Sequence, residues 1–90
     1  MLDRRLDVRL ALRVFNAVRE RGLRRGESYF WQGMTVNSDY DGYTLELSDG
    51  RSTARVYFHN KYDFEGPSRI LRQEFIDRLK RIDKMQKPES

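Results

Sequence analysis

His59 is the only histidine in this chain and the residue best suited to acid–base chemistry. An imidazole titrates close to neutral pH and acts as a general base when a carboxylate orients it. Asp41 or Asp63 is a candidate for that orienting role. The sequence offers no nucleophile or metal partner at a known spacing from His59, so a polar residue that ends a strand is the competing interpretation. We therefore predict no catalytic residues and no enzyme activity.

The segment 37–42 resembles the first half of a calcium-binding loop. Oxygen-bearing side chains alternate along it, and Gly42 occupies the sixth position. The twelfth position is Ser48, where such a loop needs a bidentate glutamate. The chain also has no cysteine, which excludes thiolate metal sites and disulfides. We predict no metal and no cofactor, and we expect 37–42 to be a loop between strands.

An arginine cluster follows the first apolar segment. Its members are Arg19, Arg21, Arg24 and Arg25. The net charge is +4, and both ends of the chain are basic whereas residues 26–67 are acidic. This pattern suits phosphate binding, with Trp31 or Tyr57 as a stacking platform for bases. It equally suits a solvated helix end, or two copies that attract each other end to middle.

Two helices are expected to position these residues. Apolar side chains at three- and four-residue spacing predict a helix over 3–21, with Gly22 as its stop. A second amphipathic stripe predicts a helix over 68–86, and Ser68 is the expected N-cap. The apolar arc of the first helix is broad, which indicates that it packs against more than one element.

Three strands are expected between the helices. The first covers 28–36, and the second and third form a hairpin around Asp49-Gly50, a dipeptide typical of a two-residue type I′ turn. This turn predicts the pairs Leu47 with Ser52, Leu45 with Ala54 and Tyr43 with Val56. The fold class is therefore α+β, in the order α-β-β-β-α, with an antiparallel three-stranded sheet packed by two helices.

The alternation of strand side chains divides the apolar residues between a core and a second sheet face. The predicted core is Leu6, Leu10, Val14, Phe15, Val18, Tyr43, Leu45, Leu47, Val56, Phe58, Leu71, Phe75, Leu79 and Ile82. The predicted binding surface is Tyr29, Trp31, Arg55, Tyr57 and His59, on the assumption that Phe30, Met34 and Val36 face inward. Exposed aromatic surface of this kind usually marks a partner site.

Three short motifs resemble a known family. They are Leu6-Asp7-Val8-Arg9, Asp41-Gly42-Tyr43-Thr44 and Phe58-His59-Asn60-Lys61-Tyr62. In a chain of this size they resemble a small bacterial family catalogued only as a domain of unknown function. The resemblance implies a bacterial cytoplasmic protein of no known activity, so it adds no catalytic residues.

Together these observations predict one domain over 1–90, with 87–90 as a frayed tail. No apolar run approaches the length of a membrane span, and charged residues follow Met1 closely, so we expect no secretory signal, no membrane association and a cytoplasmic location. The predicted function is a non-enzymatic protein-interaction module that forms a homodimer or binds a protein partner. The alternative is a nucleic-acid-binding protein.

Overall fold

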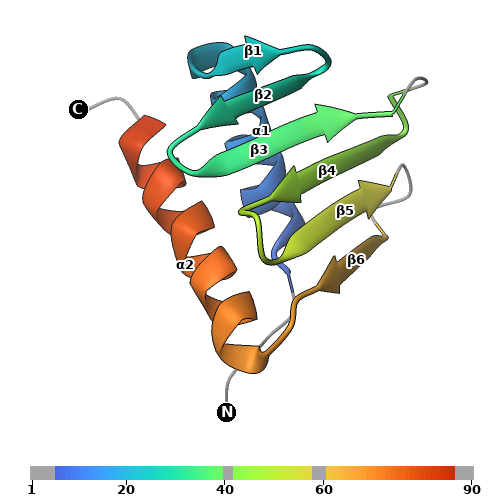
Figure 1. The fold of residues 1–90 in the computed structure, drawn as a ribbon, viewed down its shortest axis with the longest axis vertical. Coiled ribbons are helices and arrows are strands. Elements are labelled where there is room, and N and C mark those ends of the chain that lie inside the picture. The colour runs from blue at the N-terminus through green and yellow to red at the C-terminus, as the bar shows by residue number, and fades with distance from the viewer. Residues whose placement is uncertain (1–5, 40–41, 58–60, 87–90) are drawn as a thin grey trace.

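The sheet has six strands, where the sequence predicted three. The computed structural model describes residues 6–39, 42–57 and 61–86 (Figure 1). The elements, in chain order, are α1 (Val8–Arg21), β1 (Leu23–Arg25), β2 (Ser28–Trp31), β3 (Met34–Ser38), β4 (Thr44–Ser48), β5 (Thr53–Tyr57), β6 (Tyr62–Glu65) and α2 (Arg69–Gln86). Each strand pairs antiparallel with the next, so the sheet order is the chain order. The α+β class, the two helices and the antiparallel pairing are confirmed.

The predicted first strand is in fact a hairpin. β2 and β3 are joined by Gln32-Gly33, and both residues have positive φ, at 54° and 80°. A type I′ turn needs this conformation at its two central positions, and its twist matches that of the flanking strands. Trp31 consequently lies opposite Met34. The unbroken run of aromatic residues before Gln32 concealed the turn from a reading of apolar pattern alone.

The two edge strands were also missed. No strand was predicted at β1, which follows the predicted helix stop at Gly22, but Gly26, with φ of 62°, allows a tight turn that pairs Leu23–Arg25 with β2. No strand was predicted at β6, yet Tyr62 and Phe64 are half-buried whereas Asp63 and Glu65 are exposed. That alternation is the period of a strand with one covered face.

The β4–β5 hairpin has a longer loop than predicted. Leu47 pairs with Ala54 and Leu45 with Val56, a register shifted by two residues. The cause is Asp49, whose Oδ1 accepts hydrogen bonds from the backbone N–H groups of Arg51 (2.9 Å) and Ser52 (2.8 Å). These bonds stabilise a four-residue loop. A two-residue shift keeps every side chain on its predicted face, so the burial pattern survived the error in register.

Hydrogen bonds between neighbouring residues define the start of both helices and the end of α1. Asp7 caps α1 by accepting hydrogen bonds from the N–H groups of Arg9 and Leu10, and the Gly22 N–H donates to the carbonyl of Val18 at the other end. Ser68 caps α2 through its Oγ, which accepts from the Leu71 N–H at 3.2 Å. The predicted stop at Gly22 and cap at Ser68 are confirmed, and α1 begins at Val8 instead of residue 3.

The core lies on one face of the sheet, between the strands and the two helices. Ten predicted core residues are buried, namely Leu6, Leu10, Val14, Phe15, Val18, Leu47, Val56, Phe75, Leu79 and Ile82. Leu45 and Leu71 are only half-buried, and Phe58 lies outside the described residues. Tyr43 was predicted wrongly, because it precedes β4 and is exposed. The core also contains residues that the predicted core list left out, including Met34, Val36 and Ala54.

A part-buried ion pair between Arg13 and Asp83 joins the two helices. The Arg13 Nε donates to Asp83 Oδ1 at 3.0 Å and its Nη2 donates to Oδ2 at 3.2 Å, a two-pronged contact between α1 and α2. Asp83 is buried, whereas the Arg13 side chain is about half exposed. The hydrogen bonds to Asp83 raise the pKa of Arg13 above its already high ordinary value. The pair fixes the crossing of the helices that cover the sheet.

Candidate functional site

The predicted binding surface is divided between the two faces of the sheet. Tyr29 and Trp31 are half-buried and pack against the core on the helix side. Arg55 lies opposite Glu46 and Asp63 in the sheet, on the outer face that Tyr57 shares. His59 lies outside the described residues.

The reason for this division is the turn at Gln32-Gly33. Met34 and Val36 face inward as assumed, and the turn places Trp31 and Tyr29 directly opposite them. Phe30, between the two, therefore points outward and is exposed. The assumption that Phe30 faces inward is wrong. Phe30 takes the place on the outer face that Tyr29 and Trp31 were expected to occupy.

The half of the outer face formed by β4, β5 and β6 carries a polar network across these three strands. The Arg55 Nε lies 3.0 Å from Glu46 Oε2, and its Nη1 lies 3.8 Å from Glu65 Oε2. The Tyr57 hydroxyl donates to Asp63 Oδ2 at 2.7 Å, and this hydrogen bond raises the pKa of Tyr57 above its ordinary value. Cross-strand pairs of this kind make a solvated sheet face with fixed positive and negative positions.

One end of the outer face is apolar and basic. Leu23 and Phe30 are directly opposite residues of β1 and β2, and 66% and 39% of their respective surfaces are exposed. The Arg25 guanidinium lies over the Phe30 ring, 5.9 Å from its centroid. The outer face is therefore asymmetric, with an apolar, basic end at β1–β2 and an acidic end at β5–β6.

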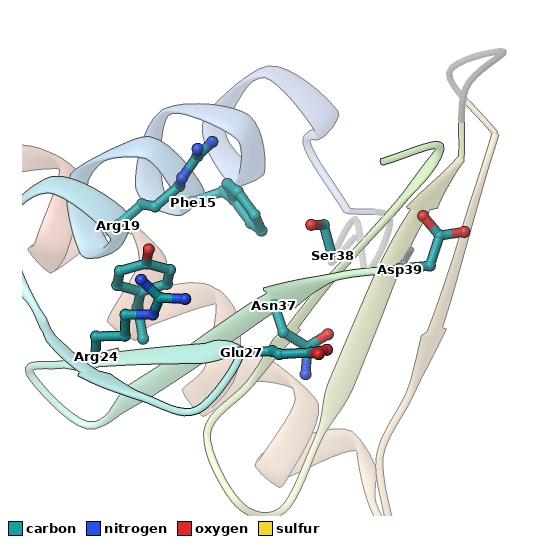
Figure 2. Close-up of a pocket in the computed structure, with 8 residues that line it drawn as sticks. Phe15, Arg19, Arg24, Glu27, Asn37, Ser38 and Asp39 are labelled. Atoms are coloured by element: carbon teal, nitrogen blue, oxygen red, sulfur yellow. The ribbon is translucent and has the colours of Figure 1, made fainter. Parts of the chain in front are cut away.

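A hollow of about 320 Å³ opens on the helix side of the sheet. Its lining residues are Phe15, Arg19, Arg24, Glu27, Tyr29, Asn37, Ser38 and Asp39. Figure 2 shows Phe15 pointing from α1 toward the sheet, with Arg19 and Arg24 on one side of the hollow and Ser38 and Asp39 on the other. Two arginines of the predicted cluster thus border one cavity, together with an aromatic wall.

The four arginines of the cluster have different surroundings. Arg21 lies over the indole of Trp31, 5.6 Å from the ring centroid, and Arg25 covers Phe30 on the outer face. Arg24 donates from Nε to the Gly26 carbonyl at 2.9 Å. Neither Arg19 nor Arg24 has a carboxylate within ion-pair distance in the described part of the chain. Of the four, Arg19 and Arg24 are the two that line the hollow.

The acid–base hypothesis gains no support from the described residues. His59 and Asp41 lie outside them, and Asp63 is engaged with Tyr57 on the outer face. Asp63 is not among the residues that line the hollow. Within 6–39, 42–57 and 61–86 no three acidic, histidine or cysteine side chains gather closely enough to hold a metal ion.

Two features of these sites escaped the sequence reading for different reasons. Phe15 and Arg19 are four residues apart on one helix, so their shared side was readable, but their facing element β1 was not expected. The outward position of Phe30 follows from Gly33 and its positive φ. The dipeptide Gln32-Gly33 could have predicted this turn, because glycine readily adopts positive φ.

The comparisons with known proteins identify a family without an assigned activity. Residues 6–89 match the family described as protein of unknown function DUF3081, and the chain therefore belongs to it. The family-level resemblance predicted from the sequence is confirmed. A search of curated proteins and a search of solved structures each found no match. Neither helix has the length and apolar character needed to cross a membrane, within the residues that the structure describes.

Proposed function

We propose that this member of a family of unknown function is a non-enzymatic interaction module of the bacterial cytoplasm that self-associates through the outer face of its sheet. The observation that carries the proposal is the one-sided cover of the sheet. The helices lie on one face of the sheet (Figure 1), with the apolar core between them and the strands, while Leu23 and Phe30 remain exposed on the other face. Adjacent exposed apolar side chains favour a protein contact.

Charge complementarity favours a second copy as the partner. A two-fold axis parallel to the strands, placed between two stacked outer faces, would set β1–β2 of one copy over β6–β5 of the other. Arg25 of each copy would then face the end of the sheet that carries Asp63 and Glu65. Such a contact uses the same surface on both copies and closes on itself, so it gives a dimer and no filament.

The apolar part of this contact is tested by Leu23→Thr with Phe30→Thr, followed by analytical ultracentrifugation over a concentration series. Threonine suits a strand, and both side chains are exposed, so the fold should be retained. We expect the dimer dissociation constant to rise at least about tenfold. The matched control is Ile70→Thr, because Ile70 is 69% exposed but lies on α2. A wild-type monomer throughout the series would overturn the proposal, as would a dimer unaffected by the double substitution.

The electrostatic part is tested by exchanging charges within one chain. Arg25→Glu and Glu65→Arg should each weaken the dimer, because each places like charges opposite one another. The double variant should regain part of the affinity, since both partners of the contact are then reversed. Failure of the double variant to recover, with both single variants folded, would contradict the two-fold arrangement.

Nucleic-acid binding is the second candidate function, and the guanidinium groups of Arg19 and Arg24 favour it. Titration with mixed-sequence RNA and DNA, followed by anisotropy of the labelled nucleic acid, tests it. Binding through these arginines should weaken steeply with salt and fall in Arg19→Gln with Arg24→Gln. Trp31 is a poor stacking platform, because it packs against the core beneath Arg21.

A further inference from the structure

We propose that the hollow between α1 and the β1–β2 hairpin is a binding site for a small organic phosphate, with Arg19 and Arg24 holding the phosphate group. Phe15, Arg19 and Arg24 line the site on the helix side of the sheet, whereas the residues proposed for self-association, Leu23 and Phe30, lie on the outer face and do not line it. The argument rests on the two arginines, the aromatic wall and the size of the hollow.

The two guanidinium groups come from different elements and border the same space (Figure 2). Arg19 extends from α1 and Arg24 from β1, and both side chains are exposed. No carboxylate in the described ranges forms an ion pair with either of them. A phosphate monoester carries close to two negative charges at neutral pH, which matches two guanidinium groups better than a single carboxylate does.

The acidic residues of the hollow form no ion pair with these arginines in the described structure. Asp39 Oδ1 accepts hydrogen bonds from the backbone N–H groups of Tyr43 (2.9 Å) and Thr44 (3.2 Å), which hold it at the β3–β4 loop. Glu27 and Asp39 line the hollow without reaching ion-pair distance of Arg19 or Arg24 in the described structure. The hollow is thus dipolar, with acceptors for an amino or ring N–H group of the ligand.

The remaining lining suits an organic body attached to the phosphate. Phe15 is a buried aromatic residue of the core, and Tyr29 is half-buried beside it. The volume of about 320 Å³ lies at the small end of the usual range for ligand sites. A ligand with one phosphate and one ring system, such as a nucleoside monophosphate, agrees with both features.

Isothermal titration calorimetry and amide chemical-shift mapping of the full chain test the proposal, with AMP, adenosine, phosphoserine and inorganic phosphate as probes. We expect AMP or phosphoserine to bind and to shift amides of α1, β1 and the β3–β4 loop. Adenosine, which lacks the phosphate, should bind at least about tenfold more weakly than AMP. Arg19→Gln with Arg24→Gln should weaken phosphate-ester binding at least about tenfold.

The matched control is Arg69→Gln with Arg81→Gln, which removes the same charge from exposed positions of α2. Binding should be retained in that variant. Equal loss in both double variants would overturn the proposal, because it would show attraction to net charge alone. Failure of every phosphate probe to bind at millimolar concentration would also overturn it. Tighter binding of a mixed-sequence RNA that displaces AMP would replace the small-molecule ligand with a nucleic acid.

Discussion

The same strands form both faces of the sheet, but the two faces differ in burial and in the chemistry of their side chains. On the helix side, Met34, Val36 and Leu47 are fully buried in the core. On the outer side, Glu46 and Arg55 form a cross-strand ion pair, and no described residue of that face is buried. Leu47 and Glu46 are consecutive in the chain, so this difference arises from alternation alone.

The comparison separates residues that hold the fold from residues that are available to bind. Substitutions on the covered face remove packed apolar volume, and their cost is set by the cavity left behind. Substitutions on the outer face remove solvated ion pairs, which contribute little to stability. A partner surface can therefore occupy the outer face without a large effect on folding, and this permits binding tests with folded variants.

Phe75→Ala should give the largest effect among the predictions on stability. Phe75 is fully buried, and its ring centroid lies 5.3 Å from that of Phe64 on β6. We expect the free energy of unfolding to fall by about 3–5 kcal/mol, enough to unfold a marginal domain. Urea denaturation measures this fall. The control on the same helix is Ile70→Ala, which should change stability by less than about 0.5 kcal/mol because Ile70 is exposed. Equal effects of the two would show that α2 does not cover the sheet as described.

Leu47→Ala and Glu46→Gln compare the two faces at adjacent positions of β4. Leu47 is fully buried, so its truncation should cost about 2–4 kcal/mol. Glu46→Gln removes one charge of a part-exposed pair with Arg55, and it should cost less than about 1 kcal/mol. The comparison is made from the urea concentrations at the midpoints of unfolding, provided that the dependence of the unfolding free energy on urea is the same in both variants. A larger loss of stability in Glu46→Gln than in Leu47→Ala would mean that Glu46, and not Leu47, faces the core.

The sequence predicted the elements whose chemistry is local. The α1 stop at Gly22 and the Ser68 cap of α2 each depend on neighbouring backbone groups. The inward residues of β4 and β5 were also predicted, because a two-residue error in register does not change faces. One strand was missed because the turn at Gln32-Gly33 carries an uncommon positive φ at a residue other than glycine, and the edge strands β1 and β6 were missed in addition.

The candidate sites were less predictable because they depend on the missed turns. Once the chain turns at Gln32-Gly33, Tyr29 and Trp31 belong to the covered face, and Phe30 belongs to the outer face with Arg55 and Tyr57. The hollow requires β1 to fold back so that Arg24 faces α1. Contacts between residues far apart in the sequence produce no periodic pattern from which they could be predicted.

Tyr57 offers the smallest and most specific test of the outer face. Its hydroxyl donates to Asp63, and this hydrogen bond raises the pKa of Tyr57 in the folded protein above the unfolded value of about 10. The stabilisation is therefore fully present below about pH 10, and it is lost as the pH rises through the raised folded value. Tyr57→Phe should destabilise the protein slightly at neutral pH, and the gap to wild type should close in alkaline solution. Asp63→Asn should return the Tyr57 titration, followed by tyrosinate absorbance, toward the ordinary value. An unchanged titration in that variant would refute the assignment of the shift to Asp63.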